Sequence, residues 1–324
     1  MTIKLLFIKP MENKTPSHIA PVFIMIAASL WAIDALFRTQ LTYSIPSSSI
    51  VFFEHLLGFL ILSPIFFKNL KSIRALRLPD WVNLVTMTVV SSVLGTIFFT
   101  QALAKSFSEF DFVTPILLQK LQPIFVVALS AVFLKEKITK KFVLLAIIAL
   151  FGSYLMSFGL TPVKLSLQGK ELVVLLALGA TFCWGAGTIM SKKVLKVLHF
   201  PVATALRFLL AIPIALIFAY TLNQTYDFTK LGFDQIWRFI VIASITGGAG
   251  ALILYYKGLQ KTEAKVSTFA ELMYPIISIF IAITALNPYG KPQSLTIEQI
   301  VGIIILLISI VFISFERKNV KEDK

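Results

Sequence analysis

Ten apolar stretches, each long enough to cross a lipid bilayer, run through this chain of 324 residues. The hydrocarbon core of a membrane is about 30 Å thick and takes about 20 residues of α-helix to cross. The connections between the stretches are short, which excludes a separate extramembrane domain. We therefore expect an all-α polytopic membrane protein with ten transmembrane helices, at residues 19–38, 47–67, 79–101, 112–134, 142–159, 170–191, 200–220, 236–256, 264–286 and 296–315.

Lys and Arg residues crowd into every second connection. The two tails and the connections after the second, fourth, sixth and eighth stretches hold 21 of them, and the opposite side, on which we count Arg38, holds 7. Because short cytoplasmic loops retain Lys and Arg, this bias predicts a cell-membrane protein with both termini in the cytoplasm. The remaining two basic residues, Lys120 and Arg207, lie inside predicted spans.

The composition argues against several other classes of protein. The net charge of +14 is spread over membrane-edge loops, so we expect no nucleic-acid partner. One cysteine, Cys183, and three scattered histidines offer neither a disulfide framework nor a metal-ligand cluster, and we expect no metal and no cofactor. The basic N-terminal segment has too short an apolar core for a signal peptide, and Met11 is an alternative to Met1 as the native start.

The second half of the chain repeats the first. Trp31 and the small residue after it recur at Trp184 with a shift of 153, and Pro123 recurs as Pro275 with a shift of 152. Each copy has five spans, an odd number, so the second copy enters the membrane from the opposite side. We expect an N-terminal cytoplasmic tail at residues 1–18 and a first five-helix repeat at residues 19–159. An inverted second repeat is expected at residues 160–315, followed by a C-terminal cytoplasmic tail at residues 316–324. Inverted repeats are typical of secondary transporters, with the substrate site near the midplane.

These repeats resemble the EamA-type transporters of the drug/metabolite transporter superfamily. The resemblance is carried by the Trp-small pair in the first helix of each copy, by the Pro-Ile pair in the fourth helix, and by residues 133–139, which are similar to the family's acidic turn. It implies ten helices in two inverted five-helix repeats, and export of amino acids or related metabolites. Arg207 stands where the family usually carries Arg, whereas the first copy has Glu54 and His55 there, and no acidic turn follows the ninth span.

Ionisable side chains inside a span cost at least about 2.5–3.5 kcal/mol each, so they face partners or a watery cavity. Lys120 and Glu271 fall near the midplane, about 8 Å apart along the membrane normal by helix rise. We expect them either to bind the two charges of a zwitterion or to form a buried ion pair between the halves.

For four further charged or titratable side chains, the sequence allows two roles each. Glu54 with His55 is a candidate for proton coupling, and the alternative is that Glu54 neutralises Lys120 or Arg38. Asp34 is expected to pair with Arg38, one helical turn away, or to face a water-filled vestibule. Arg207 is expected to brace helices or to contact substrate.

One proline in the fourth helix of each copy indicates a kink. Pro123 and Pro275 lack the backbone N–H and free a carbonyl one turn earlier, which a membrane helix tolerates beside a cavity or as an ordinary structural kink. The polar residues on the same turns are our main candidates for substrate contacts: Gln119, Lys120, Gln122, Glu271 and Tyr274. Trp31 and Trp184 are expected to wall the cavity or to serve helix packing.

The sequence as a whole predicts a secondary-active transporter of small polar or amphipathic metabolites such as amino acids, an exporter or exchanger that works by alternating access. Its expected partners are a small-molecule substrate, membrane lipid, protons and a second copy in a homodimer. No GxxxxGK[ST] phosphate loop supports ATP coupling. The alternatives are a passive facilitator or channel-like pore, and an intramembrane enzyme, for which neither an HExxH pair nor a nucleophile with a base is evident.

Overall fold

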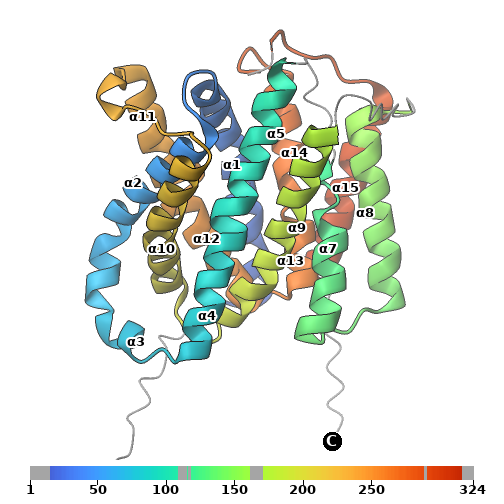
Figure 1. Ribbon diagram of the computed structural model, residues 1–324. Coiled ribbons are helices and arrows are strands. Elements are labelled where there is room, and N and C mark those ends of the chain that lie inside the picture. Colours follow the sequence, from blue (N-terminus) through green and yellow to red (C-terminus); the bar gives the residue numbers. More distant parts are fainter. Residues whose placement is uncertain (1–14, 109–114, 116–117, 161–170, 288–289, 316–324) are drawn as a thin grey trace, which may run out of the picture.

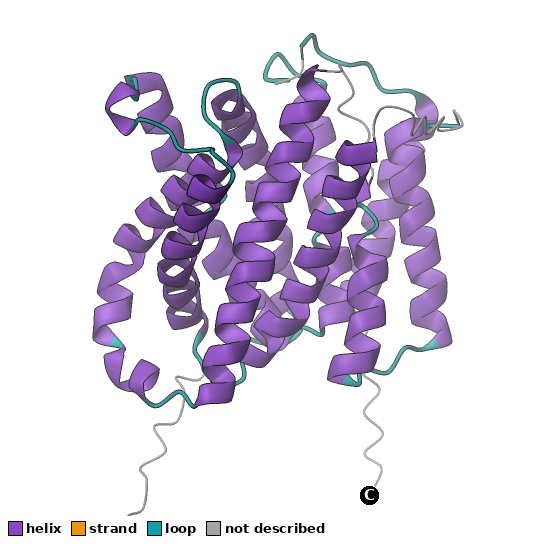
Figure 2. Ribbon diagram, in the orientation of Figure 1, coloured by secondary structure: helices purple, strands orange, loops and turns teal. Residues whose placement is uncertain are grey.

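The computed structural model describes residues 15–108, 115, 118–160, 171–287 and 290–315, and the regular elements within them are all helical (Figure 2). Within these residues, nine helices are long and apolar enough to cross a membrane, and a shorter apolar helix covers Gln122–Leu134. The expected all-α membrane architecture is therefore confirmed. The segments of the predicted tails at 1–14 and 316–324, with Met1 and Met11, lie outside the described residues.

The first repeat comprises five spans in chain order. They are α1 (Ala20–Thr42); α2 (Ser47–Lys68), followed by the short α3 (Leu70–Arg74); a third span built from α4 (Leu78–Met87), η1 (Thr88–Gly95) and α5 (Thr96–Ser108); a fourth that contains α7 (Gln122–Leu129) and η2 (Ser130–Leu134); and α8 (Lys140–Phe158).

The second repeat follows the same order. Its elements are α9 (Glu171–Val194); α10 (Phe200–Thr221) and the short η3 (Phe228–Lys230); a third span of α11 (Phe233–Val241), η4 (Ile242–Thr246) and α12 (Ala249–Lys261); a fourth span of α13 (Ala264–Ala270) and α14 (Met273–Ala282); and α15 (Ile297–Phe315). Figure 1 shows α1 beginning and α15 ending at the same end of the bundle.

Helix bounds differ from the predicted spans by a few residues, and one difference affects the site. α1 continues to Thr42, so Arg38, which the charge count assigned to an external connection, lies inside the helix and is only 8% exposed. The reason is that Arg38 has buried acidic partners, which a hydropathy pattern does not reveal. Residues 112–114, 116 and 117 of the predicted span 112–134 lie outside the described residues, and the second half of this span is α7 with η2.

The third span of each repeat contains a π-helical segment, η1 in the first and η4 in the second. Such wide turns are uncommon and recur at functional sites. Both contain small residues, and Gly247, directly after η4, shows why they matter: a Cβ there would lie 2.3 Å from the Oδ1 atom of Asp34. The small residues thus let the third spans approach the charged residues of neighbouring helices.

The fourth helix of each repeat is broken by a turn. α7 begins at Gln122 after a turn at Lys120 and Leu121, and α13 and α14 are separated by a turn at Glu271 and Leu272. Each break comes just before a proline, Pro123 or Pro275, whose missing N–H interrupts the helical hydrogen-bond ladder. The polar residues of both breaks are thereby placed at the interface of the repeats.

Candidate functional site

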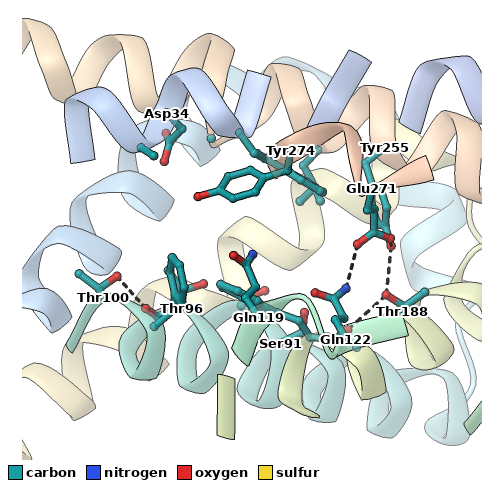
Figure 3. A pocket seen from close by; sticks show the side chains of 18 of the residues that line it. Asp34, Ser91, Thr96, Thr100, Gln119, Gln122, Thr188, Tyr255, Glu271 and Tyr274 are labelled. Carbon is teal, nitrogen blue, oxygen red and sulfur yellow. Dashed lines mark hydrogen bonds between the residues drawn. The ribbon is translucent and has the colours of Figure 1, made fainter. Parts of the chain in front are cut away.

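A cavity of about 220 Å³ of water-accessible space lies between the two repeats. One ordered water needs about 10–15 Å³ on a comparable measure, so the cavity has room for a solute of many atoms. All the candidate residues from the sequence border it, namely Trp31, Asp34, Glu54, His55, Gln119, Lys120, Gln122, Pro123, Trp184, Arg207, Glu271, Tyr274 and Pro275. Figure 3 shows Tyr274 reaching into this space from one side and Gln119 from the other.

The two helix breaks meet through a hydrogen bond. The Gln122 side-chain amide donates to the Glu271 Oε2 atom at 2.8 Å, and the Tyr255 hydroxyl donates to Oε1 at 2.9 Å (Figure 3). The Tyr255 hydroxyl lies 3.1 Å from the Thr188 Oγ1 atom, which extends the network into α9. Glu271 therefore links α7 of the first repeat with α12 of the second.

Lys120 does not pair with Glu271. Its ammonium group donates to the Ser157 hydroxyl on α8, and the described residues contain no ion pair between Lys120 and Glu271. The buried ion pair considered from the sequence is therefore wrong for this state. Depth along the membrane normal had placed the two residues at a similar level, but the direction in which each side chain points depends on helix packing.

A second polar cluster joins α1 to α2. Arg38 contacts Asp34 through Nε at 2.7 Å and Glu54 through Nη2 at 2.8 Å, and both ion pairs are about nine-tenths buried. The Thr246 hydroxyl donates to Asp34 at 3.2 Å. Asp34 and Glu54 thus share one guanidinium, and the Arg38 Nη1 atom is buried with no hydrogen-bond partner among the described residues.

His55 follows Glu54 in sequence but has different partners. Its Nδ1 atom lies 2.7 Å from the Val51 carbonyl oxygen, and its ring lies 4.9 Å from the ring of Phe208. Since a carbonyl oxygen only accepts hydrogen bonds, Nδ1 carries the proton in this arrangement. Glu54 and His55 are thus held by separate partners on α1 and α2.

Arg207 connects α10 to the third spans of both repeats. It donates to the Ser91 hydroxyl at 3.1 Å, to the Ser92 hydroxyl, and to the Tyr256 hydroxyl at 2.8 Å. No carboxylate forms an ion pair with it in the described part of the chain. This geometry matches the bracing role, and it leaves a cation on the cavity wall whose partners are all neutral.

Two aromatic pairs flank the cavity. The ring of Trp31 lies 5.2 Å from that of Tyr255, and the ring of Trp184 lies 5.1 Å from that of Phe99. Each pair joins the first span of one repeat to the third span of the other, so the two contacts are related by the internal repeat. The cavity therefore has an aromatic wall in each half.

Sequence reasoning missed two residues of the site and placed a third, Arg38, in a loop. The pairing of Arg38 with Asp34 and with Glu54, which the sequence offered as alternatives, is present in the structure. Tyr255 and Thr188 were not singled out, although Tyr255 occupies the place in its repeat that aromatic Phe99 occupies in the other. With Arg38 included, three carboxylates and three cations line the described cavity wall, so its formal charges balance.

Similar proteins are found both by sequence and by fold. The model of the EamA-like transporter family matches residues 18–158 and again 171–315. The riboflavin transporter ImpX of Fusobacterium nucleatum subsp. nucleatum is 32% identical over 296 residues, which cover 90% of this chain and 96% of that protein. A crystal structure of a protein that is 15% identical superposes with a TM-score of 0.70, covering 91% of this chain and 96% of its own, a likeness of fold alone.

Proposed function

This chain belongs to the EamA-like transporter family, and we propose that it is a secondary-active carrier of a small, planar, uncharged metabolite of the riboflavin class. It is proposed to act in the cell membrane as an exporter or exchanger. The bias of Lys and Arg toward one set of connections supports an orientation with both termini in the cytoplasm.

The observation that carries the proposal is that two aromatic contacts, related by the internal repeat, line one cavity. Trp31 with Tyr255 and Trp184 with Phe99 offer ring faces on which a flat heteroaromatic solute can stack. Gln119 and Tyr274 reach into the same space with groups that both donate and accept hydrogen bonds. Small-molecule sites commonly combine apolar walls with a few such polar groups.

Charge supports an uncharged solute. The three carboxylates and three cations of the cavity wall balance, so a solute with a phosphate group would add an uncompensated negative charge in surroundings of low dielectric. Riboflavin, the substrate named for the 32% identical relative, has a flat ring system and a polyol chain and is neutral. Its chemistry therefore agrees with the aromatic lining and the balanced charge of the cavity.

Alternating access is proposed to come from the internal repeat. The two halves have the same order of spans and meet at the two helix breaks, so they can exchange their conformations around a fixed site near the midplane. The hydrogen bond between Gln122 and Glu271 links the breaks in the present conformation.

Reconstituted proteoliposomes test this function. We expect saturable uptake of labelled riboflavin that is stimulated by unlabelled riboflavin inside the vesicles, and weaker competition by flavin mononucleotide, which carries a phosphate. Saturation and trans-stimulation distinguish a carrier from a channel-like pore, and an enzyme would give no flux. Absence of both riboflavin binding and counterflow would overturn the proposal.

A zwitterion such as an amino acid is a second candidate. Lys120 and Glu271 both border the cavity and are not paired with each other, which leaves opposite charges for the two ends of such a solute. Counterflow with a panel of amino acids in the same vesicles decides between the two classes.

A further inference from the structure

We propose that Glu271 binds and releases a proton during the transport cycle and thereby couples solute movement to a proton gradient. This inference rests on the proposed transport function and adds the coupling ion to it. It replaces Glu54 and His55, the proton-coupling candidates of the sequence, by a carboxyl group at the meeting point of the two repeats.

The partners of the cavity carboxylates distinguish them. Asp34 and Glu54 both contact Arg38 at hydrogen-bond distance. Glu271 has only neutral donors, Gln122 and Tyr255, and no Lys or Arg nitrogen lies within ion-pairing distance of it in the described part of the chain. A carboxylate that is kept from bulk water without a cation is costly, and a bound proton removes that cost.

The hydrogen-bonding capacity of those partners also matters. An Arg side chain only donates, so it favours the charged forms of Asp34 and Glu54. A Gln amide and a Tyr hydroxyl each donate and accept, so both can reorient and remain hydrogen-bonded when Glu271 carries a proton. The surroundings of Glu271 therefore accommodate both protonation states.

The neighbouring elements offer few competing titratable groups. From α12, Tyr255 faces Glu271. Just before α7, Lys120 lines the same cavity and donates to Ser157. On α1, Asp34 lines the cavity and is held by Arg38. The cavity-lining residues of α9 have no titratable side chains, and α15 contributes no residue to the described lining.

The position of Glu271 couples protonation to conformation. It lies in the turn between α13 and α14, and its carboxylate accepts the hydrogen bond that ties this turn to α7 in the other repeat. Because a charged acceptor makes a stronger hydrogen bond than a neutral one, a proton on Glu271 weakens that tie. Proton binding therefore acts at a contact that changes when the halves exchange conformations.

The test measures riboflavin counterflow and riboflavin uptake driven by an imposed pH gradient, in the same preparation of proteoliposomes. In Glu271→Gln we expect the ratio of pH-driven uptake to counterflow to fall at least tenfold. The matched control Glu298→Gln, which lies outside the cavity lining, is expected to keep the wild-type ratio. A wild-type ratio in Glu271→Gln would overturn the inference.

A second measurement does not depend on folding of the variant. When riboflavin is added to wild-type vesicles at zero membrane potential, the pH inside the vesicles should change, as reported by an enclosed pH-sensitive dye. If the wild type shows riboflavin counterflow but riboflavin addition causes no pH change, the coupling role alone is overturned. Absence of riboflavin counterflow in the wild type would instead overturn the proposed function, and with it the inference built on it.

Discussion

Gln122 and Glu271 are joined by a 2.8 Å hydrogen bond, and each lies at the broken fourth helix of its own repeat. The repeat shift of 152 residues places Tyr274 at the position of Gln122, and Gln119 at the position of Glu271. The symmetry-related counterpart of the observed contact is therefore one between Tyr274 and Gln119, which both reach into the cavity (Figure 3). If the halves exchange conformations, this second contact is expected to form as the first one opens.

Removal of the Gln122 amide should loosen the present conformation. Gln122→Ala is expected to lower the free energy of unfolding by about 1–3 kcal/mol, because Glu271 loses one of its two donors. Gln119→Ala is the matched control, since Gln119 has no hydrogen bond among the described residues. Thermal unfolding in detergent measures both. Equal stability of the two variants would show that the bond between the repeats contributes nothing.

Loss of an aromatic wall should weaken solute binding. Trp31→Ala and Trp184→Ala are each expected to reduce riboflavin affinity, since aromatic stacking contributes about 0.5–1.5 kcal/mol, or about 2- to 12-fold in the dissociation constant. Trp31→Phe should retain most of the affinity. Quenching of flavin fluorescence on binding provides the measurement, and an affinity unchanged in both alanine variants would contradict the stacking model.

The cluster around Arg38 predicts a contrast between two substitutions. Arg38→Leu leaves Asp34 and Glu54 buried without their shared cation, and we expect a loss of about 3–5 kcal/mol in the free energy of unfolding. Glu54→Gln leaves the pair of Asp34 and Arg38 intact and should cost much less. Denaturant unfolding monitored by fluorescence compares the two variants. A larger loss in Glu54→Gln would show that the charge assignment in this cluster is wrong.

Glu136, in the segment similar to the family's acidic turn, ties the two repeats together at a helix start. Its carboxylate accepts hydrogen bonds from the backbone N–H groups of Ala264 at 2.8 Å and Lys265 at 3.0 Å, at the beginning of α13. Glu136→Ala is expected to cost about 0.5–2 kcal/mol, the usual range for a lost helix cap. Hydrogen exchange should be faster at Ala264 and Lys265 in this variant, and unchanged exchange there would contradict the capping role.

The two fifth helices, α8 and α15, pack backbone against backbone at Gly302. A Cβ at this position would lie 2.2 Å from the Met156 backbone nitrogen and 2.8 Å from the Gly152 carbonyl oxygen. Gly302→Val should therefore separate the helices and reduce the yield of folded, monodisperse protein. Ile304→Val, on the exposed side of the same helix, is the control. Size-exclusion chromatography in detergent reports the outcome, and a normal profile for Gly302→Val would contradict close packing.

The sequence by itself determined the spans, the internal repeat and the membrane class. These follow from the length of apolar runs and from the spacing of Trp31, Trp184, Pro123 and Pro275, which are properties of the chain alone. It also singled out several of the polar residues that border the cavity, because polar groups within apolar runs are costly unless they have partners or water.

Only the tertiary structure decided which of these residues contact each other. Helix rise gave the depth of Lys120 and Glu271, but the direction of a side chain depends on how its helix packs, and Lys120 points toward Ser157 on α8. Arg38 was assigned to a loop, because hydropathy does not show that Asp34 and Glu54 surround it. A one-dimensional pattern thus fixes position along the membrane normal, whereas lateral contacts arise from the packing of helices far apart in sequence.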